Sequence, residues 1–207
     1  MCWNSTVSLN TFLFSAFVIF LAALNKYPIP VLIFYASFIT MQLLEYFIWK
    51  NLSDKKKNNF YSTCAGYLLL LQPIASIGLL WNVNRQLFWV LLGIYLVLVA
   101  STARLTPDHY AYVGKNGHLV WNWLEKKNIN WLLISIYFIF FFLPMLLAKE
   151  YYIFGFSFAA WIVSLYFFWK YDTWGTMWCW FANLLLFFVL IKYIFPIHEC
   201  KIYKNKK

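Results

Sequence analysis

The sequence predicts an all-α protein: a polytopic transmembrane bundle of seven helical spans, with a short hairpin-like flap between spans four and five. Three observations predict this fold. Hydrophobic residues make up 63% of the chain and charged residues only 12%, whereas a soluble domain is about 25% charged. The apolar residues form runs close to the roughly 20 residues that a helix needs to cross a bilayer. The basic residues lie between these runs and in the carboxyl-terminal tail.

The first two spans are separated by a short proline-containing turn. No basic segment and no small-residue cleavage site mark Leu9 to Leu24 as a secretory signal, so we expect a retained first span. Lys26 and Pro28-Ile29-Pro30 then lead into the second span, which ends near Trp49. The stretch from Asn51 to Asn59 holds one aspartate and three lysines, so we expect it to be an aqueous loop.

The third span contains a proline in an otherwise apolar run. Pro73 removes one backbone hydrogen bond and kinks the helix, which is tolerated in a membrane only when neighbouring groups satisfy the freed carbonyl. A polar turn, Trp81 to Gln86, separates this span from the fourth, which is followed by Arg104.

The longest polar stretch lies between the fourth and fifth spans. Gly114-Lys115-Asn116-Gly117 separates two short apolar-aromatic segments, a pattern that predicts a hairpin with a glycine-containing turn. We expect it to form a surface flap. The chain is then a single membrane domain, 1–207, with spans at about 9–24, 30–49, 61–80, 87–103, 129–148, 152–169 and 174–195 and a basic tail at 198–207.

The charge balance is strongly basic, with 17 lysines and arginines against 7 acidic residues, a net charge of +10. In a soluble protein this excess would suggest nucleic acid. Because these basic residues flank apolar runs, they are better explained as anchors to anionic lipid headgroups. We therefore expect the lipid bilayer as a partner and no nucleic acid.

Seven spans place the amino terminus and the loops after spans two, four and six on one face. Nine basic residues lie on that face and eight on the other, so the positive-inside rule gives no orientation. Two glycosylation sequons, at Asn4 and Asn51, lie on this face, and Cys2, Cys64 and Cys179 lie on or near it. They favour an amino terminus outside or in a lumen and a cytoplasmic carboxyl terminus. Chance sequons and cysteines used for packing are the alternative.

Glu45 is the only acidic residue inside an apolar run. An ionised carboxylate at membrane depth is costly, so it normally faces a protein interior or a wet cavity and has a partner. Gln42 lies one helical turn deeper on the same side of span two. These two residues are the first candidates for a solute or ion pathway.

Other spans supply further candidates. Thr176, Cys179 and Asn183 are spaced by three and four residues, which puts them on one side of span seven. Gln72 lies near the middle of span three, beside the proline. Together with Glu45 and Gln42 these residues could line a vestibule opening on the amino-terminal face.

Charges at the ends of spans could balance Glu45. Arg104, Lys170 and Asp172 lie near the same face and are the candidates. In this hypothesis Glu45 attracts a cation or carries a proton, and the amides bind the solute. The alternative is that the amides join helices to one another and that Glu45 extends to the membrane interface.

Catalytic and metal-binding motifs are not found in the sequence. His109, His118 and His198 do not have the spacing of zinc ligands. No nucleophile elbow or phosphate-binding loop occurs, and the neighbouring pair Asp108-His109 is weak evidence for catalysis. Lys192 lies near the end of span seven, which argues against a retinal Schiff base. We expect no enzyme activity, no cofactor and no metal.

Four short motifs carry a resemblance that extends over most of the chain. They are Met1-Cys2-Trp3-Asn4, Met41-Gln42 with Glu45-Tyr46-Phe47 and Trp49, Gly117-His118-Leu119-Val120-Trp121 with Trp123, and Gly175-Thr176-Met177-Trp178-Cys179-Trp180 with Asn183. With these motifs the chain resembles an uncharacterised family of small seven-span membrane proteins from large DNA viruses and protists. The resemblance implies a seven-span fold and no particular activity.

These observations predict a channel or transporter for a small ion or polar solute that uses a polar vestibule around Glu45. The alternative is a membrane protein that transports nothing, either a receptor or a structural protein of a viral or host membrane. Both alternatives leave self-association into a homo-oligomer open.

Overall fold

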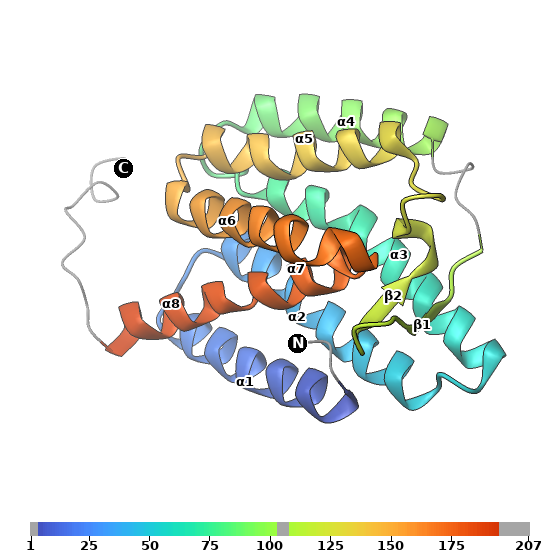
Figure 1. Cartoon of the computed structure of the whole chain (residues 1–207). Helices are drawn as coiled ribbons and strands as arrows, with labels where there is room; N and C mark the ends of the chain where they lie inside the picture. The colour runs from blue at the N-terminus through green and yellow to red at the C-terminus, as the bar shows by residue number, and fades with distance from the viewer. Residues whose placement is uncertain (1–3, 103–107, 195–207) are drawn as a thin grey trace.

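The structure is a computed structural model, and it describes residues 4–102 and 108–194. The predicted all-helical fold is confirmed (Figure 1). The helices and strands, in chain order, are α1 (Ser5–Leu24), α2 (Ile29–Lys50), α3 (Lys55–Gly78), α4 (Arg85–Thr102), β1 (Ala111–Val113), β2 (Leu119–Trp121), the 3-10 helix η2 (Asn122–Leu124), α5 (Trp131–Leu147), α6 (Tyr151–Phe168), the 3-10 helix η3 (Trp169–Tyr171), α7 (Trp174–Ala182) and α8 (Leu184–Ile194).

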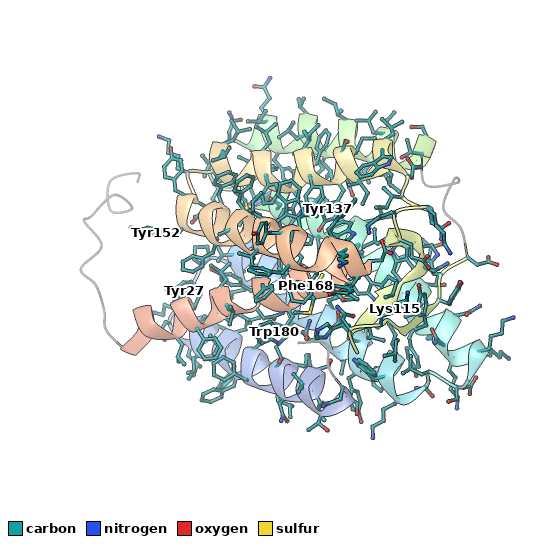
Figure 2. The ribbon with its side chains drawn as sticks, viewed as in Figure 1. Tyr27, Lys115, Tyr137, Tyr152, Phe168 and Trp180 are labelled. Carbon is teal, nitrogen blue, oxygen red and sulfur yellow. The ribbon has the colours of Figure 1, made fainter. Side chains whose placement is uncertain are left out.

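The helices lie side by side, with α2, α3, α5 and α7 inside the bundle and α4 and α1 at its edges (Figure 1). Helix α3 packs against α2 and α5, and α7 packs against α6 and α2. The hairpin formed by β1 and β2 lies at one end of the bundle, which we call the hairpin end. Figure 2 shows Lys115 at this end, Tyr27 and Tyr152 at the opposite end, and Tyr137 between them.

Within residues 4–102 and 108–194, five helical segments are long and apolar enough to cross a membrane: Ser5–Leu24, Ile29–Lys50, Lys55–Gly78, Arg85–Thr102 and Tyr151–Tyr171. Large apolar side chains are exposed on them, including Phe20 on α1 (59% exposed), Val97 on α4 (70%) and Phe167 on α6 (59%). Such surfaces are compatible with contact to lipid. Helix α5 is apolar but shorter, at 17 residues, so the described part of the chain shows five helices of spanning length where seven spans were predicted.

Two helices begin earlier than predicted because an N-terminal cap extends them. The Asn4 side chain accepts a hydrogen bond from the Val7 amide (2.9 Å), and α1 begins at Ser5. The Asp54 side chain accepts one from the Lys57 amide (3.1 Å), and this hydrogen bond lowers the pKa of Asp54. The expected aqueous loop is therefore wrong for residues 55–59, which form the first turns of α3. The cap pairs a backbone amide at the start of this helix, and the lysine side chains do not prevent the helix from forming.

The predicted seventh span is interrupted at Asn183, between α7 and α8. The Asn183 side-chain amide donates to the Cys179 carbonyl (2.7 Å), and its backbone amide donates to the Trp180 carbonyl (3.0 Å). An asparagine side chain competes in this way with the backbone pattern of a helix. The Ser15 hydroxyl of α1 donates to the Asn183 side-chain oxygen over 3.5 Å.

Prolines interrupt α3 at Pro73 and α5 at Pro144. In both helices, the carbonyl three residues before the proline accepts a hydrogen bond from a neighbouring helix. The Tyr95 hydroxyl donates to the Leu70 carbonyl (2.7 Å), and the Ser76 hydroxyl donates to the Phe141 carbonyl (2.6 Å). The carbonyl that a proline deprives of its helical donor lies four residues before it, so these two hydrogen bonds join neighbouring helices beside the prolines and do not replace the missing bond itself.

We expect Tyr95→Phe to lower the free energy of unfolding in detergent by about 1 kcal/mol, the typical net value of one hydrogen bond. Tyr67→Phe, at a tyrosine of α3 that is 66% exposed, is the control and should lower the free energy of unfolding by much less. An equal effect of the two substitutions would contradict this account.

Candidate functional site

The two predicted pathway residues of α2 lie inside the bundle. Gln42 and Glu45 are both 0% exposed, and Phe38, one turn deeper on the same side, is 3% exposed. Spacings of four and three residues place the three side chains along one side of the helix. The Glu45 carboxyl is therefore surrounded by protein.

Polar side chains of four helices are buried inside the bundle near Glu45. Cys179 of α7 and Gln72 of α3 are 0% exposed, like Glu45 of α2, and Tyr137 of α5 is 5% exposed. The Tyr137 hydroxyl donates a hydrogen bond to the Gln72 side-chain oxygen (2.6 Å). We call these four side chains, together with Gln42, the polar core.

Two amides of the polar core are incompletely hydrogen-bonded within the described ranges, 4–102 and 108–194. Neither polar atom of the Gln42 side chain has a hydrogen-bond partner, and the side-chain nitrogen of Gln72 has none. Leaving a buried polar group unsatisfied costs about 1–3 kcal/mol. Native proteins keep few such groups, and each one calls for an explanation, such as a bound ion or solute.

The side of the polar core away from the hairpin is closed by aromatic rings. Phe38 of α2, Phe141 of α5 and Trp178 of α7 contact one another edge to face, with ring centroids 5.3 to 6.3 Å apart. Phe34 extends this packing one turn further, with its centroid 5.9 Å from that of Phe141. The middle of the bundle is therefore densely filled below Gln42.

The hairpin end of the polar core is closed by the flap, and the predicted hairpin is present. Strand β1 pairs with β2 in antiparallel register, with Ala111 opposite Trp121. The Thr176 hydroxyl donates to the Leu119 carbonyl (2.9 Å), and the Asn116 side chain donates to the Thr173 hydroxyl (2.9 Å). Thr176, a predicted pathway residue, thus fastens the flap to α7.

A single asparagine of α3 fastens the other side of the flap. The Asn58 side chain donates to the Ala111 carbonyl (2.8 Å) and accepts from the Ala111 amide (3.0 Å), so it pairs with β1 as a neighbouring strand would. The Ser62 hydroxyl donates to the Asn58 side-chain oxygen (3.0 Å) and orients it. Asn58 was missed by the sequence prediction because its segment was assigned to a loop.

Two of the predicted counter-charges, Asp172 and Lys170, have contacts beside the flap. Asp172 accepts a hydrogen bond from the Lys126 backbone amide (3.1 Å), and its carboxylate lies 3.8 Å from the Lys126 ammonium. Lys170 is exposed, with its ammonium 5.9 Å from the centre of the Tyr171 ring. Both charges therefore belong to the surface beside the flap. Arg104 lies outside the described residues.

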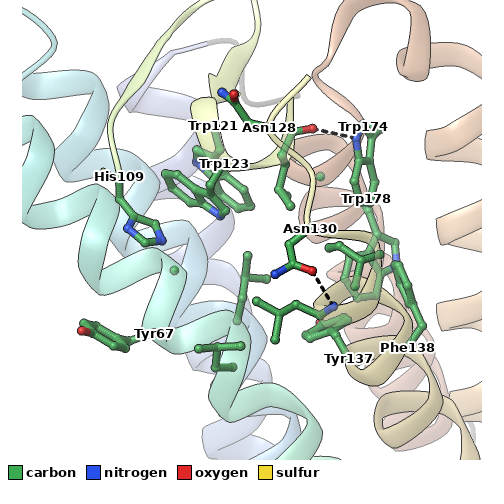
Figure 3. A pocket seen from close by; sticks show the side chains of 17 residues that line it. Tyr67, His109, Trp121, Trp123, Asn128, Asn130, Tyr137, Phe138, Trp174 and Trp178 are labelled. Carbon is green, nitrogen blue, oxygen red and sulfur yellow. Dashed lines mark hydrogen bonds between the residues drawn. The ribbon is translucent and has the colours of Figure 1, made fainter. Parts of the chain in front are cut away.

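A cavity of about 340 Å³ lies between the flap, α3, α5 and α7, and we call it the aromatic cavity (Figure 3). A second, larger and mostly apolar cavity, of about 780 Å³, lies along α2, α3 and α4. Neither of the two is lined by any of the six predicted pathway residues, Gln42, Glu45, Gln72, Thr176, Cys179 and Asn183. The aromatic cavity is lined by Gly66, Tyr67, Leu69, Leu70, His109, Trp121, Trp123, Leu124, Asn128, Asn130, Leu133, Ile134, Tyr137, Phe138, Trp174, Gly175 and Trp178.

Two glycines let the helices approach the flap closely. A Cβ atom on Gly175 of α7 would lie 2.5 Å from a Leu124 methyl group, and one on Gly66 of α3 would lie 2.7 Å from the His109 ring. Burial of His109 in this contact lowers its pKa, although the neighbouring Asp108 carboxylate acts to raise it. Burial also lowers the pKa of His118, on the opposite side of the flap turn.

Comparison of the chain with protein-family models, with curated proteins and with solved structures finds no match. The site therefore has to be interpreted from its own geometry.

Removing the Asn58 clamp should loosen the flap. We expect Asn58→Ala to lower the free energy of unfolding by about 2–3 kcal/mol, because it leaves both buried polar groups of Ala111 unpaired. Hydrogen exchange of β1 and β2, followed by mass spectrometry, should accelerate in the variant. Asn59→Ala, at the half-buried neighbour, is the matched control and should change neither measurement. Unchanged exchange in Asn58→Ala would show that the clamp does not hold the flap.

The two flap histidines should make the protein less stable in acid. Their pKa values are lowered in the folded state, so the unfolded chain takes up protons first as the pH falls below about 6.5. Stability is then fully present above that pH and is lost as the pH falls toward the folded pKa values. The thermal midpoint should decrease from pH 7 to 5, and His109→Gln combined with His118→Gln should reduce this decrease. An identical decrease in the double variant would contradict the assignment.

Proposed function

We propose that the chain crosses the membrane seven times, with α7 and α8 together forming the last crossing. This topology is supported by the flap contacts, since the regions after α2, α4 and α6 are hydrogen-bonded to one another at the hairpin end. Helix α5, with 17 residues, rises about 26 Å, slightly less than the roughly 30 Å hydrocarbon core. The proposed orientation has the amino terminus outside or in a lumen.

We propose that the protein is a channel or transporter for a small ion or polar solute and that the polar core is its binding site. The observation that carries this proposal is the pair of buried amides, Gln42 and Gln72, whose polar atoms are incompletely hydrogen-bonded among the described residues. In this function Glu45 attracts a cation or carries a proton, and the two amides bind the solute. Tyr137 donates a hydrogen bond to the side chain of Gln72.

The surroundings of the polar core favour an occluded site over an open pore. The flap closes one side through the hydrogen bond from Thr176 to Leu119, and packed aromatic rings close the other. A solute could leave only if these layers separate, and alternating opening of two gates is the behaviour of a carrier. The geometry thus supports a transporter that encloses its solute.

A membrane receptor that transports nothing is the second candidate function, and the aromatic cavity favours it. This cavity has the size of a small-molecule site and is separate from Glu45. A structural role in a viral or host membrane is the remaining alternative.

Flux measurements in vesicles test the transport proposal. The protein is reconstituted with proton and potassium gradients, and a trapped pH dye and a potassium electrode report the two fluxes. We expect flux above that of empty vesicles and a decrease of at least about tenfold in Glu45→Gln, because the charge that holds the cation is removed. Gln42→Leu and Gln72→Leu should each decrease it by a smaller factor.

Two variants serve as controls for these measurements. Asp54→Asn removes a carboxylate at the surface while keeping an N-terminal cap, and Gln86→Leu changes an exposed glutamine. Both should leave the flux unchanged. Wild-type flux equal to that of empty vesicles would reject transport of these two ions and favour the receptor or structural alternative.

A further inference from the structure

The aromatic cavity offers flat surfaces on several sides. The Trp121 and Trp123 indoles stack with centroids 5.4 Å apart and planes within 6° of parallel, and the His109 ring lies 4.6 Å from that of Trp123 (Figure 3). Across the cavity, α5 contributes Tyr137 and Phe138. Aromatic faces of this kind stack on flat, unsaturated rings.

Two tryptophans of the cavity have indole N–H groups without an acceptor in the part of the chain that the structure describes. Trp121 and Trp123 are only 1% and 7% exposed, whereas Trp174 donates to the Leu124 carbonyl and Trp178 to the Ser157 carbonyl, each over 3.3 Å. The indole nitrogens of Trp121 and Trp123 are fully buried, so these residues offer the cavity their ring surfaces and not their donors.

Asn130 adds a hydrogen-bond donor with a fixed orientation. Its side-chain oxygen accepts a hydrogen bond from the Leu133 amide (3.1 Å) and thereby caps α5. The side-chain nitrogen is therefore left as the free end of the amide, and Figure 3 shows it turned toward the cavity. A ligand would meet an N–H donor at this position and no acceptor.

The described residues that line the cavity favour a neutral ligand. They include no aspartate, glutamate, lysine or arginine. Among these residues a quaternary cation finds aromatic rings without a carboxylate, and an anion finds no ammonium or guanidinium group. Tyr67 lines the cavity and is 66% exposed, so the cavity reaches the outer surface of α3, where a ligand could enter.

We propose that the aromatic cavity binds a neutral ligand with a flat, unsaturated ring and a carbonyl oxygen, which accepts a hydrogen bond from the Asn130 amide. A quinone has this chemistry, and it could come from the aqueous phase or from the bilayer. The ring stacks on an aromatic face of the cavity, and the carbonyl pairs with the side-chain nitrogen of Asn130. The inference does not depend on whether the polar core transports a solute.

Binding of two quinones to the full chain in lipid nanodiscs tests the proposal. Duroquinone has no tail and dissolves in water, whereas decylubiquinone carries an alkyl tail and partitions into the bilayer. Quenching of tryptophan fluorescence reports binding, and equilibrium dialysis confirms its stoichiometry. We expect saturable binding of at least one quinone. Binding of both supports a ligand from the water phase, and binding of decylubiquinone alone supports a ligand from the membrane.

The decisive variant is Asn130→Asp. Aspartate caps a helix as well as asparagine does, so α5 should be retained, while a carboxylate oxygen replaces the donor that faces the ligand. We expect the dissociation constant to rise at least about tenfold. Asn84→Asp is the matched control, because the Asn84 side chain caps α4 in the same way, by accepting from the Leu87 amide (3.0 Å), and does not line the cavity.

Several results would overturn the proposal. They are the absence of saturable binding of both quinones, wild-type affinity in Asn130→Asp, or an equal loss in Asn84→Asp. Tetraethylammonium binding that strengthens in Asn130→Asp would assign the cavity to a cation instead. Should Asn130→Asp fail to fold, Asn130→Ser decides, because a serine side chain also caps a helix and removes the amide donor. Its affinity should fall several-fold, and wild-type affinity would reject the proposal.

Discussion

Hydrogen-bond satisfaction in a low-dielectric interior is the constraint on which this structure depends. A bundle inside a bilayer has no water to pair with its polar groups, so partners have to come from other helices. Tyr95 and Ser76 donate to helix carbonyls beside the two prolines, and Asn58 pairs with strand β1. The amides of Gln42 and Gln72 are among the buried polar groups that remain incompletely paired within the described residues, and they lie next to the buried carboxyl of Glu45 in the polar core. The free-energy cost of leaving these two amides unpaired is the reason for proposing the polar core as a binding site.

The polar core and the aromatic cavity share a side chain. Tyr137 lines the cavity with its ring, while its hydroxyl donates to Gln72 in the polar core. Trp178 also lines the cavity and packs on the aromatic rings that close the core below Gln42. A ligand that shifts either ring would therefore act directly on the groups that enclose the proposed solute. Receptor and transporter functions are then compatible in one bundle, because Tyr137 and Trp178 each line the aromatic cavity and border the polar core.

The apolar runs were sufficient to predict the helices, and helical spacing was sufficient to place Gln42 and Glu45 on one side of α2. The sequence prediction was weaker wherever one polar side chain redirects the backbone. Asn4 and Asp54 start helices α1 and α3 early, and Asn183 interrupts the predicted seventh span. Long-range contacts were also missed. Lys126, the partner of Asp172, lies 46 residues away in the chain, and no local pattern encodes such a pairing. Tyr137 could have been suspected, since it carries a hydroxyl within an apolar run, but its contact with Gln72 depends on how α3 and α5 pack.

The helix start at Asn130 shows how the fold fixes the chemistry of a cavity. An asparagine amide can present either an acceptor or a donor, and its orientation is decided by the bonds around it. At Asn130 the Leu133 amide needs an acceptor, so the oxygen faces the helix and the nitrogen faces the cavity. Trp121 and Trp123 contribute ring surfaces to this cavity, because their indole nitrogens are fully buried. The end of the Asn130 amide that faces the cavity is therefore a donor, and a ligand that pairs with it has to bring the acceptor.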